Sequence, residues 1–195
     1  KLGGELLPQD FLDGSWLLII FAGNDTSRNS LSGTIRLMTQ FPDQRAMVLD
    51  DPSLIPKMSE EALRMVSPVM HMRRTALEDT ELNGQMIAKD EKLVLWYGAA
   101  NRDADVFPNP DTFNMLRPNV EKHIAFGHGV HKCLGSRIAK MQLRLAFERI
   151  FDRFPDISWT GKQTISPNSL VHAISSLQVN LYGPNGKRPT KVAVS

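Results

Sequence analysis

The chain has 195 residues, of which 42% are hydrophobic and 23% charged, as expected for one globular domain or part of one. Lysine and arginine number 23 against 21 aspartates and glutamates, so the charge balance gives no argument for binding nucleic acid or an anionic membrane surface. One cysteine excludes an internal disulfide and fits a reducing compartment, so we expect a cytoplasmic protein. The longest apolar run, Trp16 to Ala22, is about a third of a membrane-spanning length, so we expect no membrane segment.

The first predicted element is a long helix over residues 10–41, which Pro42 ends. Its middle reads AGNDT at residues 22–26, and four of these five residue types are poor in helix interiors. The low helix propensity of residues 22–26 therefore contradicts the apolar periodicity on both sides, which predicts a helix. A helix of this length needs partners to bury its faces, and few precede or follow it. We therefore expect that the N-terminal part of the domain is absent.

The rest of the chain predicts shorter elements in a mainly α fold with small β-sheets. One short helix follows Pro42, and another covers residues 56–66. Asn83-Gly84 between two apolar-polar segments is the strongest hairpin signal. Residues 101–125 show no clear period and predict a meandering segment. A second long helix is expected over residues 134–154, and short strands around Asn168 within residues 156–182.

The only cysteine, Cys133, lies in the sequence FGHGVHKCLG at residues 126–135. A lone cysteine is most often a buried structural thiol, and a catalytic cysteine–histidine pair is possible in principle. Zinc is disfavoured because no second cysteine stands at ligand spacing. The glycines around the thiol indicate a backbone that lies close to something flat and bulky. A thiolate at the start of a helix, on a glycine-rich loop, is what an iron porphyrin needs as its fifth ligand.

FGHGVHKCLG resembles the haem-binding loop of cytochrome P450 at every fixed position. Three further segments match that family's motifs in order and spacing. They are AGNDT at residues 22–26 for the oxygen-activation motif, EALR at 61–64, and FNMLR at 113–117 for the meander motif, where Met115 replaces the usual proline. The resemblance covers nearly the whole chain. It implies that residues 1–195 are the C-terminal part of a single haem-thiolate monooxygenase domain.

The resemblance also implies roles for individual residues. Cys133 would be the axial thiolate of the iron of haem b, and Asp25 and Thr26 would deliver protons to bound dioxygen. Glu61, Arg64 and Arg117 would form a buried structural ion-pair network. Contacts to the cofactor would come from Ala22, Gly23, Arg74, His123, Phe126, Gly127, His131 and Gly135, with Arg74, His123 and His131 as donors to the haem propionates.

Residues 67–82 and 93–103 resemble the corresponding segments of a bacterial group within this family, which includes alkane and fatty-acid terminal hydroxylases. We expect a monooxygenase that hydroxylates the terminus of an alkane or fatty acid, with hydroxylation of terpene or steroid side chains as the alternative. A non-catalytic haem-binding relative is an alternative of another class. Electrons would come from NAD(P)H through a reductase and a ferredoxin, which a basic patch at Lys132, Arg137, Lys140 and Arg144 would bind. The expected apolar substrate contacts are Val69, Met70, Met72, Leu170 and Val171.

Overall fold

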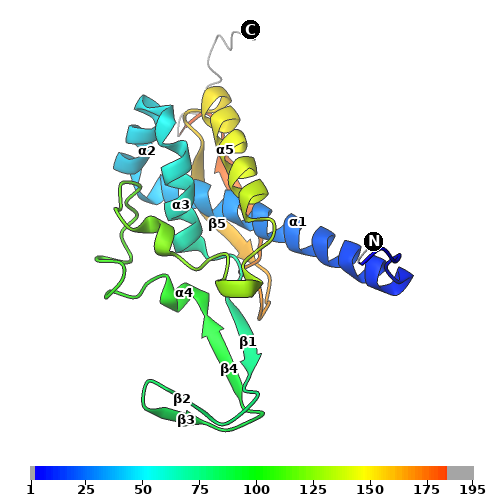
Figure 1. Ribbon diagram of the computed structural model, residues 1–195. Helices are drawn as coiled ribbons and strands as arrows, with labels where there is room; N and C mark the ends of the chain where they lie inside the picture. The colour runs from blue at the N-terminus through cyan, green and yellow to red at the C-terminus, as the bar shows by residue number, and fades with distance from the viewer. Residues whose placement is uncertain (1–2, 184–195) are drawn as a thin grey trace.

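A computed structural model describes residues 3–183 and shows a mainly helical fold with three two-stranded sheets (Figure 1). The α-helices are α1 (Gln9–Gln40), α2 (Pro42–Asp50), α3 (Ile55–Val66), α4 (Tyr97–Ala100) and α5 (Ser136–Arg153). Single 3-10 turns cover Pro52–Leu54 (η1), Val120–Lys122 (η2) and Gly129–His131 (η3). The predicted class, mainly α with small β-sheets, is confirmed, and the predicted bounds of α1, α3 and α5 lie within about two residues of the observed ones.

Helix α1 is continuous through the AGNDT stretch, despite the poor helix formers there. Thr26, Ser30 and Thr34 each donate their side-chain hydroxyl to the carbonyl four residues earlier, at 2.7–2.8 Å. Asn29 Nδ2 donates to a carbonyl one turn earlier in the same way, at 2.8 Å. These bonds satisfy the four side chains within the helix itself, so they leave no polar group of this set without a partner.

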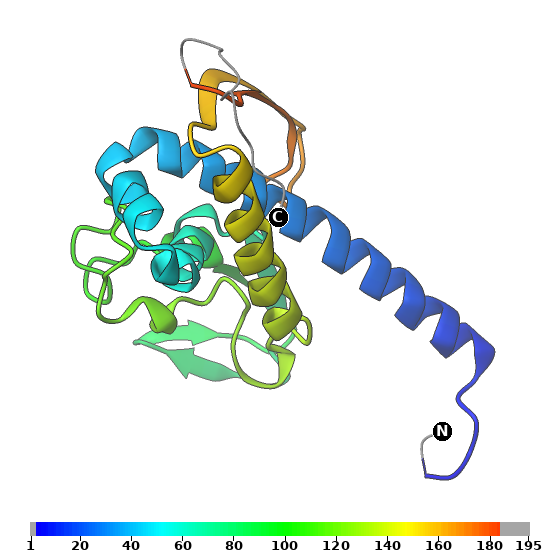
Figure 2. The same cartoon turned by 90° about the horizontal axis from the view of Figure 1, so that it is seen from above.

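The two halves of α1 have different surroundings. The first half projects away from the rest of the molecule (Figure 2), and its apolar side chains are open, with Trp16 64% and Phe21 57% exposed. The second half crosses the body of the fold and buries Leu37 and Met38. The apolar periodicity that predicted one long helix therefore describes both a core segment and an uncovered apolar face.

The hydrophobic core lies where the second half of α1 meets α3 and α5. Helix α3 is buried on most of its surface, and its Met58 and Leu63 are at most 2% exposed. Phe147 of α5 is 0% exposed and stacks on Phe151 with ring centroids 5.5 Å apart. These three helices form the packed base that carries Asp25, Thr26, Glu61 and Arg64 and from which the Cys133 loop leads into α5.

Close packing between α1 and α3 depends on Gly33, because a Cβ there would lie 2.6 Å from Val66 Cγ2. We expect Gly33→Ala to lower the free energy of unfolding by about 1–3 kcal/mol, the usual cost of overpacking, despite the better helix propensity of alanine. In Gly14→Ala, the matched control on the same helix, the added Cβ meets nothing within 4 Å, and the variant should be stabilised. Urea denaturation measures both, and equal effects would contradict the close contact.

The sheets are antiparallel hairpins attached to this base. Strand β1 (His71–Thr75) pairs with β4 (Lys92–Trp96), and β2 (Thr80–Leu82) pairs with β3 (Gln85–Ile87). The β2–β3 turn is Asn83-Gly84, with φ of 49° and 80°, which confirms the predicted hairpin. Strand β5 (Ser158–Ile165) pairs with β6 (Ile174–Asn180) around the predicted turn region and packs on α1.

Candidate functional site

Cys133 lies on the loop between η3 and α5, and it is exposed. The Cys133 N–H donates to the Phe126 carbonyl at 2.8 Å, which closes the loop into a compact turn. Gly127 and Gly129 have φ of 70° and 69°, a conformation that residues with side chains rarely adopt. Of the interpretations open from the sequence, the buried structural thiol is therefore wrong, because the thiol reaches the surface.

The surface around this thiol fits a large, flat, apolar group. Val130 is 97% exposed and Leu134 94%, so apolar side chains on both sides of the cysteine have no cover. A Cβ on Gly129 would meet nothing within 4 Å, whereas one on Gly127 would lie 3.3 Å from Tyr97 Oη. The loop thus has open space beside its backbone at Gly129, whereas at Gly127 it packs closely on Tyr97. The donor set, one soft thiol within an apolar surround, suits the iron of a porphyrin.

Asp25 and Thr26 lie near the middle of α1 with partly exposed side chains. The Thr26 hydroxyl donates to the Ala22 carbonyl at 2.8 Å. Asp25 Oδ1 accepts from Arg28 Nη2 at 2.6 Å, a surface ion pair between residues three positions apart. The structure therefore ties the Thr26 hydroxyl to the preceding turn of α1, while the Asp25 carboxylate pairs with Arg28 and is partly exposed.

This stretch of α1 packs against α5, the helix that follows the Cys133 loop. Ser27 Oγ donates to Gln142 Oε1 at 3.3 Å. Beside it, a Cβ on Gly23 would meet nothing within 4 Å, and Ala22 is exposed. The small residues expected to contact the cofactor thus leave open space on α1, and Gly135 stands at the start of α5 next to the thiol.

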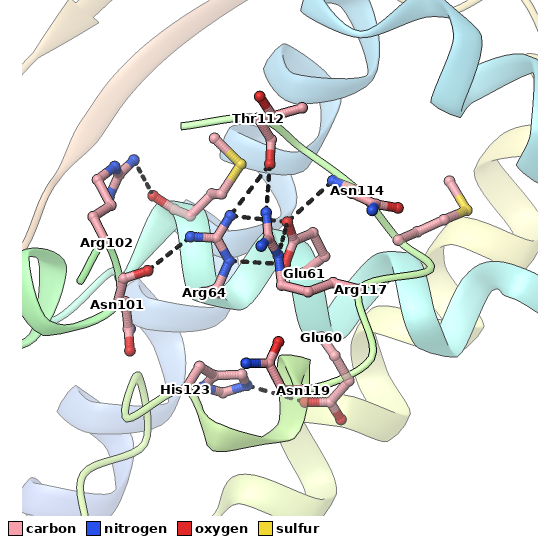
Figure 3. A network of polar contacts seen from close by, with 12 residues as sticks. Glu60, Glu61, Arg64, Asn101, Arg102, Thr112, Asn114, Arg117, Asn119 and His123 are labelled. Atoms are coloured by element: carbon pink, nitrogen blue, oxygen red, sulfur yellow. Dashed lines mark hydrogen bonds and ion pairs between the residues drawn. The ribbon is translucent and has the colours of Figure 1, made fainter. Parts of the chain in front are cut away.

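A buried ion-pair network joins α3 to the meandering segment (Figure 3). Glu61 accepts from Arg64 Nε and Nη2, each at 2.8 Å, and from Arg117 Nε at 3.1 Å. Glu61 and Arg64 are 0% exposed, and Arg117 is 7% exposed. Two cations share one carboxylate, and their remaining N–H groups donate to backbone carbonyls of Asn101, Pro108, Asn109 and Thr112. The meander is thereby fixed on α3.

Met115, at the place of the proline in the meander motif, has a contact that proline could not make. Its N–H donates to Gln44 Oε1 of α2 at 2.9 Å, and its side chain is 1% exposed. Proline has no N–H to donate. The departure from the motif is therefore accommodated by a hydrogen bond to α2 and by burial in the core.

His123 has a different partner from the haem propionate expected from the sequence (Figure 3). Its ring is buried, with Nε2 3.0 Å from Glu60 Oε2, and its Nδ1 accepts from the Ala125 N–H at 3.2 Å. Burial raises the pKa of Glu60, but hydrogen bonds from His123 and Lys140 outweigh it, so this pKa lies below its ordinary value. In the described residues His123 therefore makes a structural contact that holds the segment before the Cys133 loop, and its contact with a haem propionate stays a prediction.

The other two expected propionate donors are more accessible. Arg74 lies on β1, half-buried, and its Nη1 donates to the Arg73 carbonyl at 3.0 Å. His131 lies in η3 and is exposed two residues before the cysteine. The prediction that Arg74 and His131 bind the anionic groups of a cofactor stays a prediction.

The expected substrate contacts lie on two segments that the fold brings together. Val69 and Val171 form an antiparallel bridge, and the Met70 N–H donates to the Leu170 carbonyl at 2.9 Å. Val171 is 4% exposed and belongs to the core, whereas Met72 is 39% exposed on β1. These residues differ widely in accessibility, and their role as substrate contacts stays a prediction.

A cavity of about 410 Å³ lies next to these segments and is lined by Met70 and Trp96 together with Arg36, Arg102 and His172. Burial, followed by the positive charges of Arg36 and Arg102, lowers the pKa of His172 below its ordinary value. This cavity combines an apolar wall with positive charge. Met70, one of the five predicted substrate contacts, is among its lining residues.

The expected basic patch is smaller than the sequence indicated. Lys140 Nζ lies 2.6 Å from Glu60 Oε1, and Arg144 Nε lies 3.7 Å from Glu148 Oε1. Their charges are thus partly neutralised within the chain. Lys132 and Arg137 are exposed beside the Cys133 loop and retain the arrangement that an acidic partner would need.

Two residues that hold the site together were missed from the sequence, Glu60 and Asn101. Asn101 is 0% exposed, donates its side-chain N–H to Ser67 Oγ at 2.8 Å and accepts from the Ile124 N–H at 2.7 Å. It thereby ties the end of α3 to the segment before Cys133. Neither residue stands out by periodicity, because each acts through side-chain bonds to distant backbone or to a distant ring.

Comparison with known proteins was made on sequence and on structure. The sequence profile of the family described as Cytochrome P450 matches residues 53–180. Linalool 8-monooxygenase of Pseudomonas putida is 43% identical over 92% of this chain and 44% of its own length. Methyl-branched lipid omega-hydroxylase of Mycobacterium tuberculosis is 35% identical over 92% of this chain and 42% of its own.

Among solved structures, cytochrome P450-153 from Novosphingobium aromaticivorans superposes with a TM-score of 0.82 at 44% identity, over 90% of this chain and 44% of that one. The chain thus spans about half the length of the relatives it matches, or somewhat less. Within residues 3–183, no helix is both long enough and apolar enough to cross a membrane.

Proposed function

The chain belongs to the cytochrome P450 family, and on that premise we propose that it acts in a haem-dependent monooxygenase. The reaction is RH + O2 + 2e⁻ + 2H⁺ giving ROH and water, with one oxygen atom inserted into an unactivated C–H bond. The observation that carries the proposal is the exposed Cys133 thiol, framed by two glycines of positive φ and by uncovered apolar side chains.

Cys133 is assigned as the residue whose thiolate would hold the iron of haem b. Haem b bound there would supply the activation of dioxygen. Gly127 and Gly129 allow the loop to lie close to a flat ring. Arg74 and His131 would bind the propionates, since guanidinium and imidazole groups form charge-assisted hydrogen bonds with carboxylates.

Asp25 and Thr26 are assigned to proton delivery. The Thr26 hydroxyl is held by the Ala22 carbonyl, which fixes its oxygen on one side of α1. Asp25 is partly exposed, and Arg28 Nη2 lies 2.6 Å from its carboxylate. A carboxylate open to solvent and a hydroxyl on the next residue are the groups from which a proton relay would be built.

We expect Thr26→Ala to uncouple turnover, so that reduced cofactor is consumed while peroxide is released. Product formed per NAD(P)H should fall at least about tenfold, because a positioned proton-transfer group typically contributes about 10²–10⁴-fold. The matched control is Thr34→Ala, which removes the same hydroxyl with the same back-bond two turns further along α1. If the Thr26 variant formed as much product per NAD(P)H as wild type, the assignment of Thr26 to proton delivery would be contradicted.

For the substrate, we propose terminal hydroxylation of an alkane or fatty acid. The apolar residues Val69, Met70 and Met72 on one segment and Leu170 and Val171 on the other support an apolar substrate. The relative named a methyl-branched lipid omega-hydroxylase supports a lipid chain. The relative named linalool 8-monooxygenase supports the alternative, a terpene or steroid side chain.

Electrons would come from NAD(P)H through a reductase and a ferredoxin. The exposed cations Lys132 and Arg137 beside the Cys133 loop support an acidic donor that docks there. Charge pairing across such a surface raises the association rate and weakens with salt. Electron transfer should accordingly slow as ionic strength rises.

Spectral titration of the full-length, haem-loaded protein tests the substrate class. Alkanes, fatty acids, terpenes and sterols of matched solubility are added, and the haem absorption change gives each dissociation constant. Tightest binding of alkanes or fatty acids, followed by their terminal hydroxylation, is the expected result. Preference for terpenes or sterols would support the alternative, and binding without any oxidised product would identify a non-catalytic relative.

A further inference from the structure

The two ring nitrogens of His123 have fixed and different roles. The Ala125 N–H can only donate, and it lies 3.2 Å from Nδ1, so Nδ1 carries the lone pair. The ring proton is therefore on Nε2, which lies 3.0 Å from Glu60 Oε2 and donates to it. The buried ring thus makes one charge-assisted bond to α3 and accepts one bond from the backbone just before the Cys133 loop.

The other oxygen of Glu60 binds α5, the helix that follows the same loop. Lys140 Nζ of α5 lies 2.6 Å from Glu60 Oε1 and 5.7 Å from the centroid of the Phe126 ring. The His123 ring centroid lies 6.0 Å from that of Phe126. Phe126 is therefore in contact with both partners of one carboxylate, and its own carbonyl accepts the Cys133 N–H.

We propose that Glu60 and His123 are positioning residues that fix the Cys133 loop, by holding the Ala125 N–H and the Phe126 ring in place. This inference rests on the proposed function, in which Cys133 ligates the iron. The path runs from Glu60 on α3, through His123, to the backbone at Ala125. It continues through Phe126 to the amide of the cysteine.

The adjacent carboxylates of α3 have separate tasks. Glu61 binds the two arginines that fix the meander, and Glu60 binds His123 and Lys140. Loss of the Glu60 pair would leave the His123 ring without its acceptor and free the Phe126 ring to move. The predicted consequence is local, at residues 124–133, rather than a general loss of the fold.

The experiment compares Glu60→Ala and His123→Ala in the full-length, haem-loaded protein. The first measurement is amide hydrogen exchange over residues 124–133. The second is the rate at which the thiolate absorption band of the reduced, CO-bound protein converts to the form with a neutral thiol. Both rates should rise about tenfold, as expected when a hydrogen bond to a charged group is lost.

Two controls separate positioning from general destabilisation. Leu143→Ala removes a buried core side chain of α5 and should lower global stability without this selective effect. His123→Asn keeps an acceptor near the Nδ1 position, so exchange at Ala125 should partly recover relative to His123→Ala. Exchange and conversion rates no faster than in Leu143→Ala would overturn the proposal. A wild-type protein lacking the thiolate band would instead overturn the assignment of Cys133, which is a separate failure.

Discussion

Replacing Glu61 with glutamine should lower the free energy of unfolding by about 3–5 kcal/mol, because it strands two buried guanidinium groups without a counter-charge. Arg64 is 0% exposed and Arg117 is 7% exposed, so water cannot replace the lost carboxylate. Glutamine keeps the shape of the side chain, which isolates the effect of charge. The backbone carbonyls around both arginines remain, but they are neutral acceptors and do not balance two cations.

Urea denaturation of wild type and variant, under identical cofactor conditions, gives the difference in free energy. Glu148→Gln is the matched control, because its carboxylate lies 3.7 Å from Arg144 in an exposed pair. That variant should change stability by less than about 1 kcal/mol. A Glu61 variant no less stable than the Glu148 variant would contradict the structural role of the network.

Residues 1–195 expressed alone should bind haem weakly and tend to aggregate. The apolar side chains of the first half of α1 are uncovered, with Leu17 71% and Ile20 63% exposed. The thiol loop is also open, with Val130 and Leu134 almost fully exposed. At roughly 25 cal/mol per Å², each 100 Å² of apolar cofactor surface left in water forfeits about 2.5 kcal/mol of binding free energy.

Haem stoichiometry and size-exclusion chromatography of this product test the expectation. A forfeit of about 2.5 kcal/mol corresponds to a roughly 60-fold weaker affinity. The full-length, haem-loaded protein, measured in parallel, serves as the reference. A monomeric product that holds one haem per chain would show that the exposed faces of α1 and the loop need no further cover.

Sequence patterns were enough to predict those elements that depend on apolar periodicity or on the conformational preference of a few adjacent residues. The long helices follow from apolar spacing and flanking prolines, and the β2–β3 hairpin follows from the left-handed preference of Asn83-Gly84. The Glu61, Arg64 and Arg117 positions came from short motifs rather than from periodicity. The AGNDT stretch was correctly placed within a long helix, although only the structure showed how its polar side chains are satisfied.

Sequence reasoning failed where a side chain is defined by a distant partner. The Glu60 partner of His123 had no signal in the sequence, because it lies 63 residues away, and the propionate contact of His123 stays a prediction. Lys140 and Arg144 suggested free positive charge, yet both face carboxylates. Asn101 gave no signal, because its role depends on backbone groups that only the folded chain brings near. Such contacts have no period and no fixed spacing.

The absorption spectrum of the reduced, CO-bound full-length protein tests the central claim most directly, because its main band reports whether a thiolate ligates the iron. Wild type should show the thiolate band, and Cys133→Ala should lose it, since the sequence has no second cysteine to take its place. His131→Ala, two residues away on the same loop, should keep the band. A Cys133→Ala protein that retains the thiolate band would contradict the account.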